Sequence, residues 1–368
     1  MNILFLVNHL NVGGITSYIL TLGKGLKERG HRVFVASRGG NLLSRMLELG
    51  LECVIVPLDT KNEISPKIAI SAFMLNSLIK KEKIDIIHSN SRTTQVLASI
   101  LSRRRGVASV FTCHGFFKPR FIRKIFPCWG YKVIAISHQV EEHLIGDFKV
   151  HRDDVVVVHN GIDIQRFKNI DPKFRAEERN KFGLTDSPVV GIVARLSDVK
   201  GHIYLLEAMK IVVDKIPQAQ LLIVGEGKMR DELINRMGIL GIEGNVRLVR
   251  HSEDTRKVLS AIDVFVMPSL QEGLGLALME AMAAGLAVVG SDIGGIKALI
   301  NEGENGLLVR PADSHGLAAA ILDLLQDEAK RKRLGEEAAR FIERSFSQEK
   351  MVHETEMVYR ECLSLKRG

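Results

Sequence analysis

Cysteine and aromatic residues are scarce in this sequence. Only 4 of its 368 residues are cysteine, 1 is tryptophan, and aromatic residues make up 5%. The cysteines show neither the close pairing of a disulfide scaffold nor the spacing of a zinc site; they are Cys53, Cys113, Cys128 and Cys362. The sequence therefore predicts reduced thiols in a cytoplasmic protein, without a metal site.

Long apolar runs are absent as well. No segment offers the roughly 18 uninterrupted apolar residues of a membrane-spanning helix. The apolar run at residues 3–7 is too short for a signal peptide, and no basic residues precede it. We therefore expect neither a membrane span nor a leader, and we find no tandem repeat or low-complexity tract.

Length, apolar content and uneven charge are what the sequence does offer. With 368 residues, 46% hydrophobic and 26% charged, it suits a soluble globular protein of two domains. Residues 1–160 contain 22 Lys and Arg against 12 Asp and Glu, whereas the remainder contains 29 against 31. This asymmetry indicates an anionic partner for the first half alone.

One segment of the first half interleaves aromatic and basic residues. It covers residues 116–129 and includes Trp129, and three arginines at 103–105 precede it. Such a composition is typical of an interfacial membrane segment, so our hypothesis is peripheral docking on anionic lipid. A helix that packs its aromatic side chains inward explains the pattern as well, and no nucleic-acid recognition motif accompanies it.

The most informative stretch runs from residue 264 to residue 289. An apolar strand is closed by Pro268, a loop contains Gly273 and Gly275, and good helix formers follow from Leu276 until a second apolar strand begins. The loop combines bare backbone N–H groups with the positive end of a helix dipole. This combination predicts an anion-binding site.

Two carboxylates frame this loop, since Glu272 precedes the helix and Glu280 lies within it. Eight residues of helix span about 12 Å, whereas paired glycosidase carboxylates lie roughly 5–9.5 Å apart. We therefore expect the two side chains to bind hydroxyl groups, of a sugar at one end and a ribose at the other. On spacing alone, two solvated glutamates are the alternative.

The same stretch resembles a known signature. Glu272 and Glu280 are separated by seven residues within a Pro-Ser-x-x-Glu-Gly-x-Gly context, which is similar to the motif of family 4 of the retaining glycosyltransferases. Leu274 replaces the usual phenylalanine, and Ala287 replaces the usual proline. The resemblance implies the GT-B fold, an α/β architecture of two Rossmann-like doubly wound domains that face each other across a cleft.

Strand and helix patterns alternate along both halves, which independently predicts parallel, doubly wound sheets. Ligands of such sheets bind at the carboxyl ends of the strands. At the first of these ends lie Gly13 and Gly14, which resemble the family's N-terminal glycine loop. The resemblance implies backbone N–H groups that contact the nucleotide-sugar phosphate or the acceptor, although a tight turn before a helix is the simpler interpretation.

His114 follows another apolar strand of the first half, within Thr-Cys-His-Gly. The position matches the family's interdomain histidine, which faces the sugar and phosphate of the bound nucleotide sugar. The resemblance implies a hydrogen bond that orients this substrate and stabilises charge. From position alone, a histidine that caps the strand is the alternative.

Arg195 and Lys200 follow the first strand of the second half, in Ala-Arg-Leu-Ser-x-x-Lys-Gly. A guanidinium and an ammonium group at one strand end suit a pyrophosphate. The pair resembles the family's diphosphate clamp, and single surface cations are the alternative. With these two residues, the catalytic set implied by the resemblance is His114, Arg195, Lys200 and Glu272.

The remaining strand ends complete the expected nucleotide-sugar site. Glu226 follows one strand, and Arg250 follows the strand whose end lines the nucleobase pocket in the family. Gly294 and Gly295 resemble a Gly-Gly-x-Pro-Glu element that here lacks its proline and glutamate. The binding residues implied by the resemblance are Gly13, Gly14, Glu226, Arg250, Gly273, Leu274, Gly275 and Glu280.

Three segments are expected. Residues 1–164 form an acceptor-binding domain, residues 165–345 form a nucleotide-sugar-binding domain, and the helix of residues 346–368 crosses back onto the first domain, as in the family. An Asn-Gly-Ile-Asp sequence that begins at Asn160 resembles the family's crossing between domains.

The resemblance implies a retaining, metal-independent glycosyltransferase that needs no cofactor. It would move a sugar from a nucleotide diphosphate-sugar, most commonly a UDP-sugar, to a glycan or lipid-linked acceptor in cell-envelope polysaccharide or lipopolysaccharide synthesis. We expect no nucleic-acid partner and a location in the cytoplasm or at the cytoplasmic face of the membrane. The alternatives are another GT-B enzyme, such as a nucleotide-sugar epimerase or a phosphorylase, and a non-catalytic nucleotide-binding protein.

Overall fold

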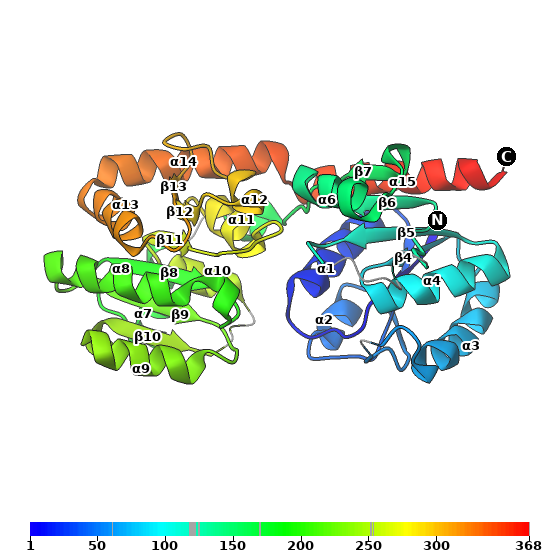
Figure 1. Ribbon diagram of the computed structural model, residues 1–368, viewed down its shortest axis with the longest axis horizontal. Coiled ribbons are helices and arrows are strands. Elements are labelled where there is room, and N and C mark those ends of the chain that lie inside the picture. Colours follow the sequence, from blue (N-terminus) through cyan, green and yellow to red (C-terminus); the bar gives the residue numbers. More distant parts are fainter. Residues whose placement is uncertain are drawn as a thin grey trace. The chain divides into compact units, whose positions relative to one another are not determined.

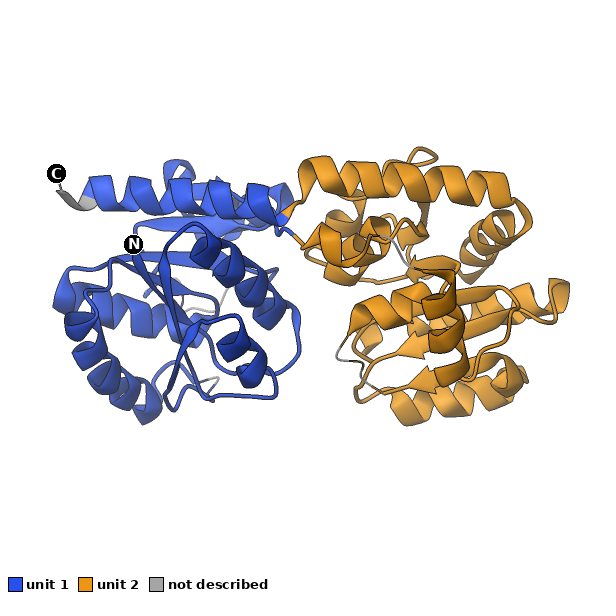
Figure 2. Cartoon of the chain, turned by 180° about the vertical axis from the view of Figure 1, so that it is seen from behind, with its two compact units in different colours: residues 1–161, 348–368 blue, residues 162–347 orange. Residues whose placement is uncertain are grey.

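A computed structural model describes residues 1–367 except Lys61, residues 118–122, Lys124, Ile125, residues 169–170, His251 and Glu253. The chain divides into two compact units (Figure 2). The first unit comprises residues 1–161 and 348–368, and the second comprises residues 162–347.

The first unit is built on a seven-stranded parallel sheet with the order β3-β2-β1-β4-β5-β6-β7; its strands β4 to β7 are labelled in Figure 1. Its strands are β1 (Asn2–Leu6), β2 (Arg32–Ser37), β3 (Glu52–Ile55), β4 (Ile86–Ser89), β5 (Ala108–Cys113), β6 (Lys132–Ala135) and β7 (Val155–Val157). The strand order reverses at β1, so the carboxyl ends of β1 and β4 form a topological switch point.

Helices cover both faces of this sheet. They are α1 (Gly14–Glu28), α2 (Leu43–Glu48), α3 (Pro66–Lys81), α4 (Arg92–Arg105), α6 (His138–Phe148) and α15 (Gln348–Arg367). Ile3 and Phe5 of β1 belong to a core shared with α1 and α15, whereas Leu4 and Leu6 belong to a core shared with α3 and α4. Because successive side chains along β1 point to opposite faces of the sheet, this strand contributes to the cores on both faces.

The last helix, α15, belongs to the first unit although it follows the second unit in sequence. It packs on α1, and Met351, Val352 and Tyr359 are buried in the core that α1 shares with the sheet. It begins at Gln348, two residues after the expected start of the crossing helix. The units divide between residues 161 and 162, three residues before the expected boundary.

The second unit repeats the architecture with a six-stranded parallel sheet in the order β10-β9-β8-β11-β12-β13. The strands are β8 (Val189–Val193), β9 (Gln220–Val224), β10 (Val246–Val249), β11 (Val264–Met267), β12 (Ala287–Ser291) and β13 (Leu307–Val309). The helices are α7 (Pro172–Lys181), α8 (His202–Lys215), α9 (Arg230–Leu240), α10 (Thr255–Ser260), α11 (Leu276–Ala283), α12 (Gly294–Lys297), α13 (Ser314–Gln326) and α14 (Glu328–Ser345).

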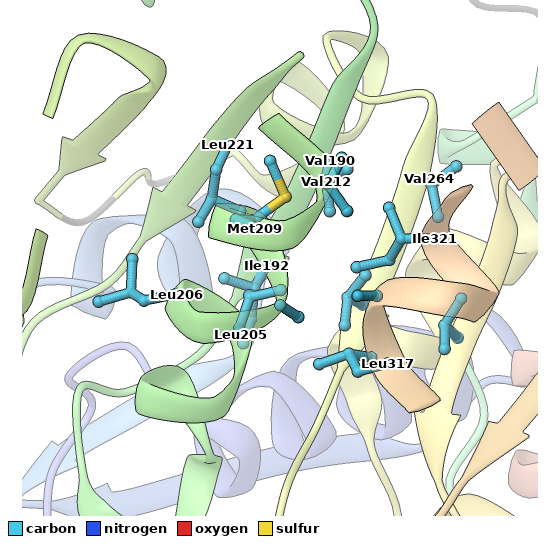
Figure 3. Close-up of a cluster of buried hydrophobic side chains, with 14 of the residues drawn as sticks. Val190, Ile192, Leu205, Leu206, Met209, Val212, Leu221, Val264, Leu317 and Ile321 are labelled. Carbon is cyan, nitrogen blue, oxygen red and sulfur yellow. The ribbon is translucent and has the colours of Figure 1, made fainter. Parts of the chain in front are cut away.

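The core of the second unit is a continuous apolar layer between this sheet and its helices. Leu205 and Met209 of α8 and Leu317 and Ile321 of α13 gather with residues of β8, β9 and β11 (Figure 3). Because the strands are buried on both faces, they are uniformly apolar rather than alternating. The predicted fold class, two Rossmann-like doubly wound domains, is confirmed.

Candidate functional site

The loop between β11 and α11 is held in place by close packing around glycine residues. A β-carbon on Gly275 would lie 2.6 Å from the Met267 sulfur, and one on Gly295 would lie 2.1 Å from the Gly273 carbonyl oxygen. Gly275 is the N-cap of α11 and provides no capping side chain. The helix therefore presents its first N–H groups at the carboxyl end of β11, as the anion-site prediction requires.

Lys200 and Glu272, predicted from separate motifs, form an ion pair in the structure. Their side chains are only 19% and 15% exposed. Lys200 ends a single 3₁₀ turn, Asp198–Lys200, that follows β8, and Glu272 lies in the loop after the neighbouring strand β11. The ammonium group therefore sits beside the glycine loop.

Gly201 allows these two loops to meet. Its φ of +70° is the left-handed conformation that favours glycine, and a β-carbon here would lie 1.9 Å from the Pro268 carbonyl oxygen. The Leu270 N–H also donates to the Val199 carbonyl oxygen at 2.8 Å. Any other residue at position 201 would push the Lys200 loop away from the Glu272 loop.

Arg195 lies exposed at the carboxyl end of β8. Its guanidinium makes no hydrogen bond or ion pair with any residue that the structure describes. Glu226 lies next to it, because the Leu196 N–H donates to the Glu226 carbonyl oxygen at 2.9 Å. Arg250 is exposed at the end of β10, and its neighbour His251 is outside the described residues. The predicted site residues that follow strands of this one sheet are therefore Arg195, Lys200, Glu226 and Arg250.

Glu280 has different neighbours from Glu272. It is half-buried in α11, and burial raises its pKa to about 7, with the Thr255 hydroxyl and the charge of Arg166 acting in the opposite direction. Arg166 itself is paired with Asp254 at 2.6 Å. A carboxyl group with this pKa exists in both protonation states near neutral pH.

His114 lies in the first unit, directly after β5, and its ring packs edge-on against Tyr18 with the centroids 4.7 Å apart. Its Nε2 is 3.0 Å from Asn90 Oδ1. Burial lowers the pKa of His114 to about 3, so the ring is neutral at physiological pH.

The surroundings of Asn90 determine which nitrogen of His114 carries the proton. The Asn90 amide nitrogen donates to the carbonyl oxygens of Leu6, at 3.5 Å, and His88, at 3.3 Å. Because carbonyl oxygens only accept, Oδ1 must face His114, and Nε2–H must donate to it. The remaining ring nitrogen, Nδ1, therefore carries a lone pair and can accept a hydrogen bond.

A cavity of about 240 Å³ opens beside these residues within the first unit. It is lined by Asn90, Arg92, His114, Phe116 and Phe117 among others. Sequence reasoning found His114 but missed Asn90. The available signal was the switch-point rule, because Asn90 directly follows β4, the strand beside β1 at which the order reverses.

Gly13 and Gly14 lie at the first turn, as their sequence position requires, and both are exposed. Gly13 is the N-cap of α1 without a capping side chain, and nothing lies within 4 Å of where its β-carbon would be. This open space is compatible with a ligand at the helix N-terminus, although packing within the protein does not require glycine there.

The basic and aromatic segment at 116–129 is only partly described, since residues 118–122, Lys124 and Ile125 lie outside the described residues. Trp129 packs against Phe111 and Phe148, at centroid distances of 5.9 and 5.6 Å. Phe126 is 64% exposed. The aromatic residues of the segment thus divide between the protein interior and its surface.

The described residues contain neither a membrane-spanning helix nor a cluster of metal-ligating side chains. No helix there is long and apolar enough to cross a membrane. Within the same residues, no three side chains of His, Cys, Asp or Glu come together as metal ligands.

Comparison with known proteins identifies the family. The model of the glycosyl transferases group 1 matches residues 174–341, and that of glycosyltransferase family 4 matches residues 12–166. The chain belongs to the group 1 glycosyltransferases of family 4. The predicted family is therefore confirmed, and the two models between them span both units of this glycosyltransferase.

Two relatives are similar to this glycosyltransferase over most of their length. A UDP-Gal:alpha-D-GlcNAc-diphosphoundecaprenol alpha-1,3-galactosyltransferase of Escherichia coli is 29% identical over 78% of each chain. The N-acetyl-alpha-D-glucosaminyl L-malate synthase of Bacillus anthracis is 26% identical over 96% of this chain and 95% of the relative.

The solved structures agree on the fold. The Anabaena protein HepE, crystallised with UDP and glucose, has a TM-score of 0.87 and 23% identity, with coverage of 98% of this chain and 100% of that one. A glycosyltransferase from Rickettsia africae has a TM-score of 0.86 and 23% identity over 98% of each chain. At this identity the likeness shows the GT-B fold and nothing finer.

Proposed function

We propose that this glycosyltransferase moves a sugar from a UDP-sugar to a glycan or lipid-linked acceptor in cell-envelope polysaccharide or lipopolysaccharide synthesis, with retention of the anomeric configuration. The name of the E. coli relative mentions a UDP-sugar and a diphosphoundecaprenol-linked acceptor, and it supports this choice. So does the UDP bound in the Anabaena structure. The retaining outcome rests on the family motif that contains Glu272 and Glu280.

The observation that carries the proposal is the placement of Lys200, Arg195 and the N-terminus of α11 at adjacent strand ends of the second unit. Cleavage of the bond between the anomeric carbon and the diphosphate leaves negative charge on UDP and positive charge on the sugar. A preorganised ammonium, a free guanidinium and backbone N–H groups oppose this negative charge. One such hydrogen-bond donor contributes about 3–4 kcal/mol to the transition state.

Glu272 has a double role in this proposal. In the free enzyme its ion pair keeps Lys200 in place without a ligand. With substrate bound, we assign its carboxylate to hydroxyls of the transferred sugar, while Lys200 turns its charge to the diphosphate. Removal of Glu272 would therefore affect both sugar recognition and the position of the ammonium group.

His114 has an orienting role in the first unit. Its ring is neutral, and Nδ1 has a lone pair because Asn90 accepts the proton on Nε2. Such a nitrogen accepts a hydrogen bond from a sugar hydroxyl and places no positive charge next to the cationic sugar of the transition state. A histidine of this kind orients the substrate without acting as a nucleophile.

Glu280 suits the ribose of the nucleotide. A carboxylate can accept hydrogen bonds from both ribose hydroxyls, whereas the protonated group has one fewer acceptor site. Since the pKa of Glu280 is about 7, its share of the binding energy should grow as the pH rises through neutrality. Glu226 and Arg250, which follow β9 and the edge strand β10, complete the proposed nucleotide-sugar site, with Arg250 at the strand end expected to line the base pocket.

We further propose that the reaction needs no divalent metal, since Arg195 and Lys200 supply the positive charge that a metal would supply. The enzyme should be incubated with a UDP-sugar, a candidate acceptor and EDTA, and the glycosidic product analysed by NMR. Formation of a product with the anomeric configuration of the UDP-sugar supports the proposal. A product of inverted configuration, or activity that appears only with added metal, would contradict it.

The same assay separates the alternative functions. An epimerase converts the nucleotide sugar without an acceptor, and a phosphorylase depends on inorganic phosphate. A non-catalytic nucleotide-binding protein leaves the UDP-sugar intact under all of these conditions. Omission of the acceptor, followed by addition of phosphate, therefore assigns the class from the products alone.

A further inference from the structure

Helix α3 in the first unit has two apolar stripes, and only one of them is buried. Ile68, Ala72, Leu75 and Ile79 are at most 3% exposed and pack on the sheet. A second stripe points away from this core, although globular proteins rarely expose several large apolar side chains together. The exposed stripe consists of Ile70, Phe73 and Met74, which are 51%, 79% and 44% exposed. Ile64, just before the helix, extends it and is 79% exposed.

The exposed stripe continues into a cluster of cations. Lys80 and Lys81 end α3, and three arginines at 103–105 end the neighbouring helix α4 (Figure 1). Neither helix contains an acidic residue. Among the described residues, the only ion pair of these five cations joins Lys81 to Glu82 at 3.5 Å.

Apolar and cationic side chains meet in one groove. The apolar residues Phe73 and Met74 and the cations Lys80, Lys81 and Arg105 line one hollow of about 680 Å³. Arg105 is held in place by Asn76 of α3 through a side-chain hydrogen bond. The surface formed by α3 and the end of α4, with Ile64, is called the α3–α4 face below.

We propose that the α3–α4 face docks on the surface of an anionic lipid bilayer. Apolar side chains on a helix enter the boundary between headgroups and acyl chains, while neighbouring Lys and Arg side chains reach the phosphates. Each such cation strengthens binding to an anionic leaflet by about fivefold. The absence of carboxylates from both helices removes the repulsion that would oppose this contact.

Charge also argues against a second copy of this chain as the occupant. Two α3–α4 faces brought together by a twofold axis would place one cationic cluster near the other, which is unfavourable. The α3–α4 face shares no residue with the basic and aromatic segment at 116–129, and its residues are not among those assigned to sugar transfer. Docking is therefore independent of the proposed reaction and can be tested without substrate.

The test is flotation of the full-length protein with phosphatidylcholine vesicles that contain or lack phosphatidylglycerol. We expect binding to the anionic vesicles only, and weaker binding as salt is added. The apolar variant Ile70→Ser/Phe73→Ser should bind at least tenfold more weakly, and the charge variant Arg103→Glu/Arg104→Glu should lose at least about 25-fold. Both variants should retain the far-UV circular dichroism and the melting temperature of the wild type, since these side chains are exposed.

Matched controls come from exposed positions of the second unit. Ile234 and Ile239 are 46% and 66% exposed on α9, so Ile234→Ser/Ile239→Ser is the control for the apolar variant. Lys332→Glu/Arg344→Glu on α14 changes the net charge by the same amount as the charge variant. Both controls should float as the wild type does.

Three results would overturn the proposal. The first is wild-type protein that fails to bind anionic vesicles, and the second is an apolar variant that binds as tightly as its control. The third is sedimentation velocity that shows a dimer of the wild type, absent from the apolar variant, because the face would then join two copies. Transfer activity on a water-soluble acceptor is measured in parallel, so loss of docking and loss of the proposed reaction are distinguished.

Discussion

The proton on His114 can be moved by changing Asn90, and this prediction follows directly from hydrogen-bond geometry. Asn90→Leu has nearly the same size but no acceptor for Nε2–H of His114. The partly buried N–H would then lack its partner, which costs about 1–3 kcal/mol, and the tautomer with the proton on Nδ1 becomes competitive. That tautomer presents a donor where the proposed mechanism needs an acceptor, so kcat should fall by roughly 10- to 100-fold.

Asn90→Asp keeps the acceptor and adds a charge. At the observed 3.0 Å, the Coulomb attraction between a carboxylate and an imidazolium is about 5 kcal/mol at an effective dielectric constant of about 20. Desolvation of the new carboxylate offsets part of this attraction, as does its approach to the carbonyl oxygens of Leu6 and His88, which now accept from the Asn90 amide. The pKa of His114 should therefore rise from about 3 by roughly 1–3 units. The Asp variant should therefore keep the native tautomer and most of the activity at pH 8, and lose activity as the pH falls toward 5.

The assay is ¹⁵N NMR of the histidine rings in the full-length protein, with the His114 signals assigned by comparison with His114→Gln. Wild type and Asn90→Asp should show the proton on Nε2, and Asn90→Leu should show a shift toward Nδ1. The neighbouring His88 ring should be unchanged in protonation, because burial also lowers its pKa to about 3. Equal kcat and an unchanged tautomer in Asn90→Leu would show that Asn90 does not set the proton position on His114.

Three further predictions concern the second unit. Lys200→Met should lower kcat by at least about 100-fold while changing the KM for the UDP-sugar much less. The reason is that the positive charge of Lys200 opposes negative charge that develops only in the transition state. An unchanged kcat would limit Lys200 to ground-state binding. UDP affinity should rise between pH 6 and pH 8 as Glu280 ionises, since a carboxyl group with a pKa of about 7 gains its charge in that window. Calorimetry should show a smaller rise for Glu280→Gln. Equal pH profiles of the two proteins would exclude ribose binding by the Glu280 carboxylate. Gly201→Ala should lower the free energy of unfolding by roughly 2–3 kcal/mol, because of the positive φ and the clash with Pro268. Urea denaturation measures this difference. A stability within error of the wild type would show that the loop around Gly201 adapts freely.

The fold was predictable because its signals are local. Uniformly apolar strands separated by helical patterns indicate parallel sheets, and the glycine-containing turns fix where the helices begin. The stretch from Pro268 to Glu280 identified both the loop and its two carboxylates. Lys200 and Glu272 could be placed on one sheet edge for the same reason.

Other features depend on contacts between distant segments, which no local pattern contains. The pairing of Lys200 with Glu272 needs the approach of two loops at Gly201, and the raised pKa of Glu280 is caused by its burial, which appears only when the chain is packed. The two stripes of α3 are both apolar at helical spacing, so only the packed structure shows which one faces the sheet. The expected roles of Arg250 and Glu226 remain predictions.

The most direct test of the central claim is a calorimetric titration of UDP and of uridine, in EDTA, with wild type and with Arg195→Met/Lys200→Met. We expect the wild type to bind UDP without metal and the double variant to bind it at least about 100-fold more weakly, since each charge-assisted hydrogen bond is worth about 1.5–3 kcal/mol. Uridine, which has no phosphate, should bind both proteins equally. Equal UDP affinity in the two proteins, or wild-type binding that disappears in EDTA, would contradict the claim that these two cations hold the diphosphate.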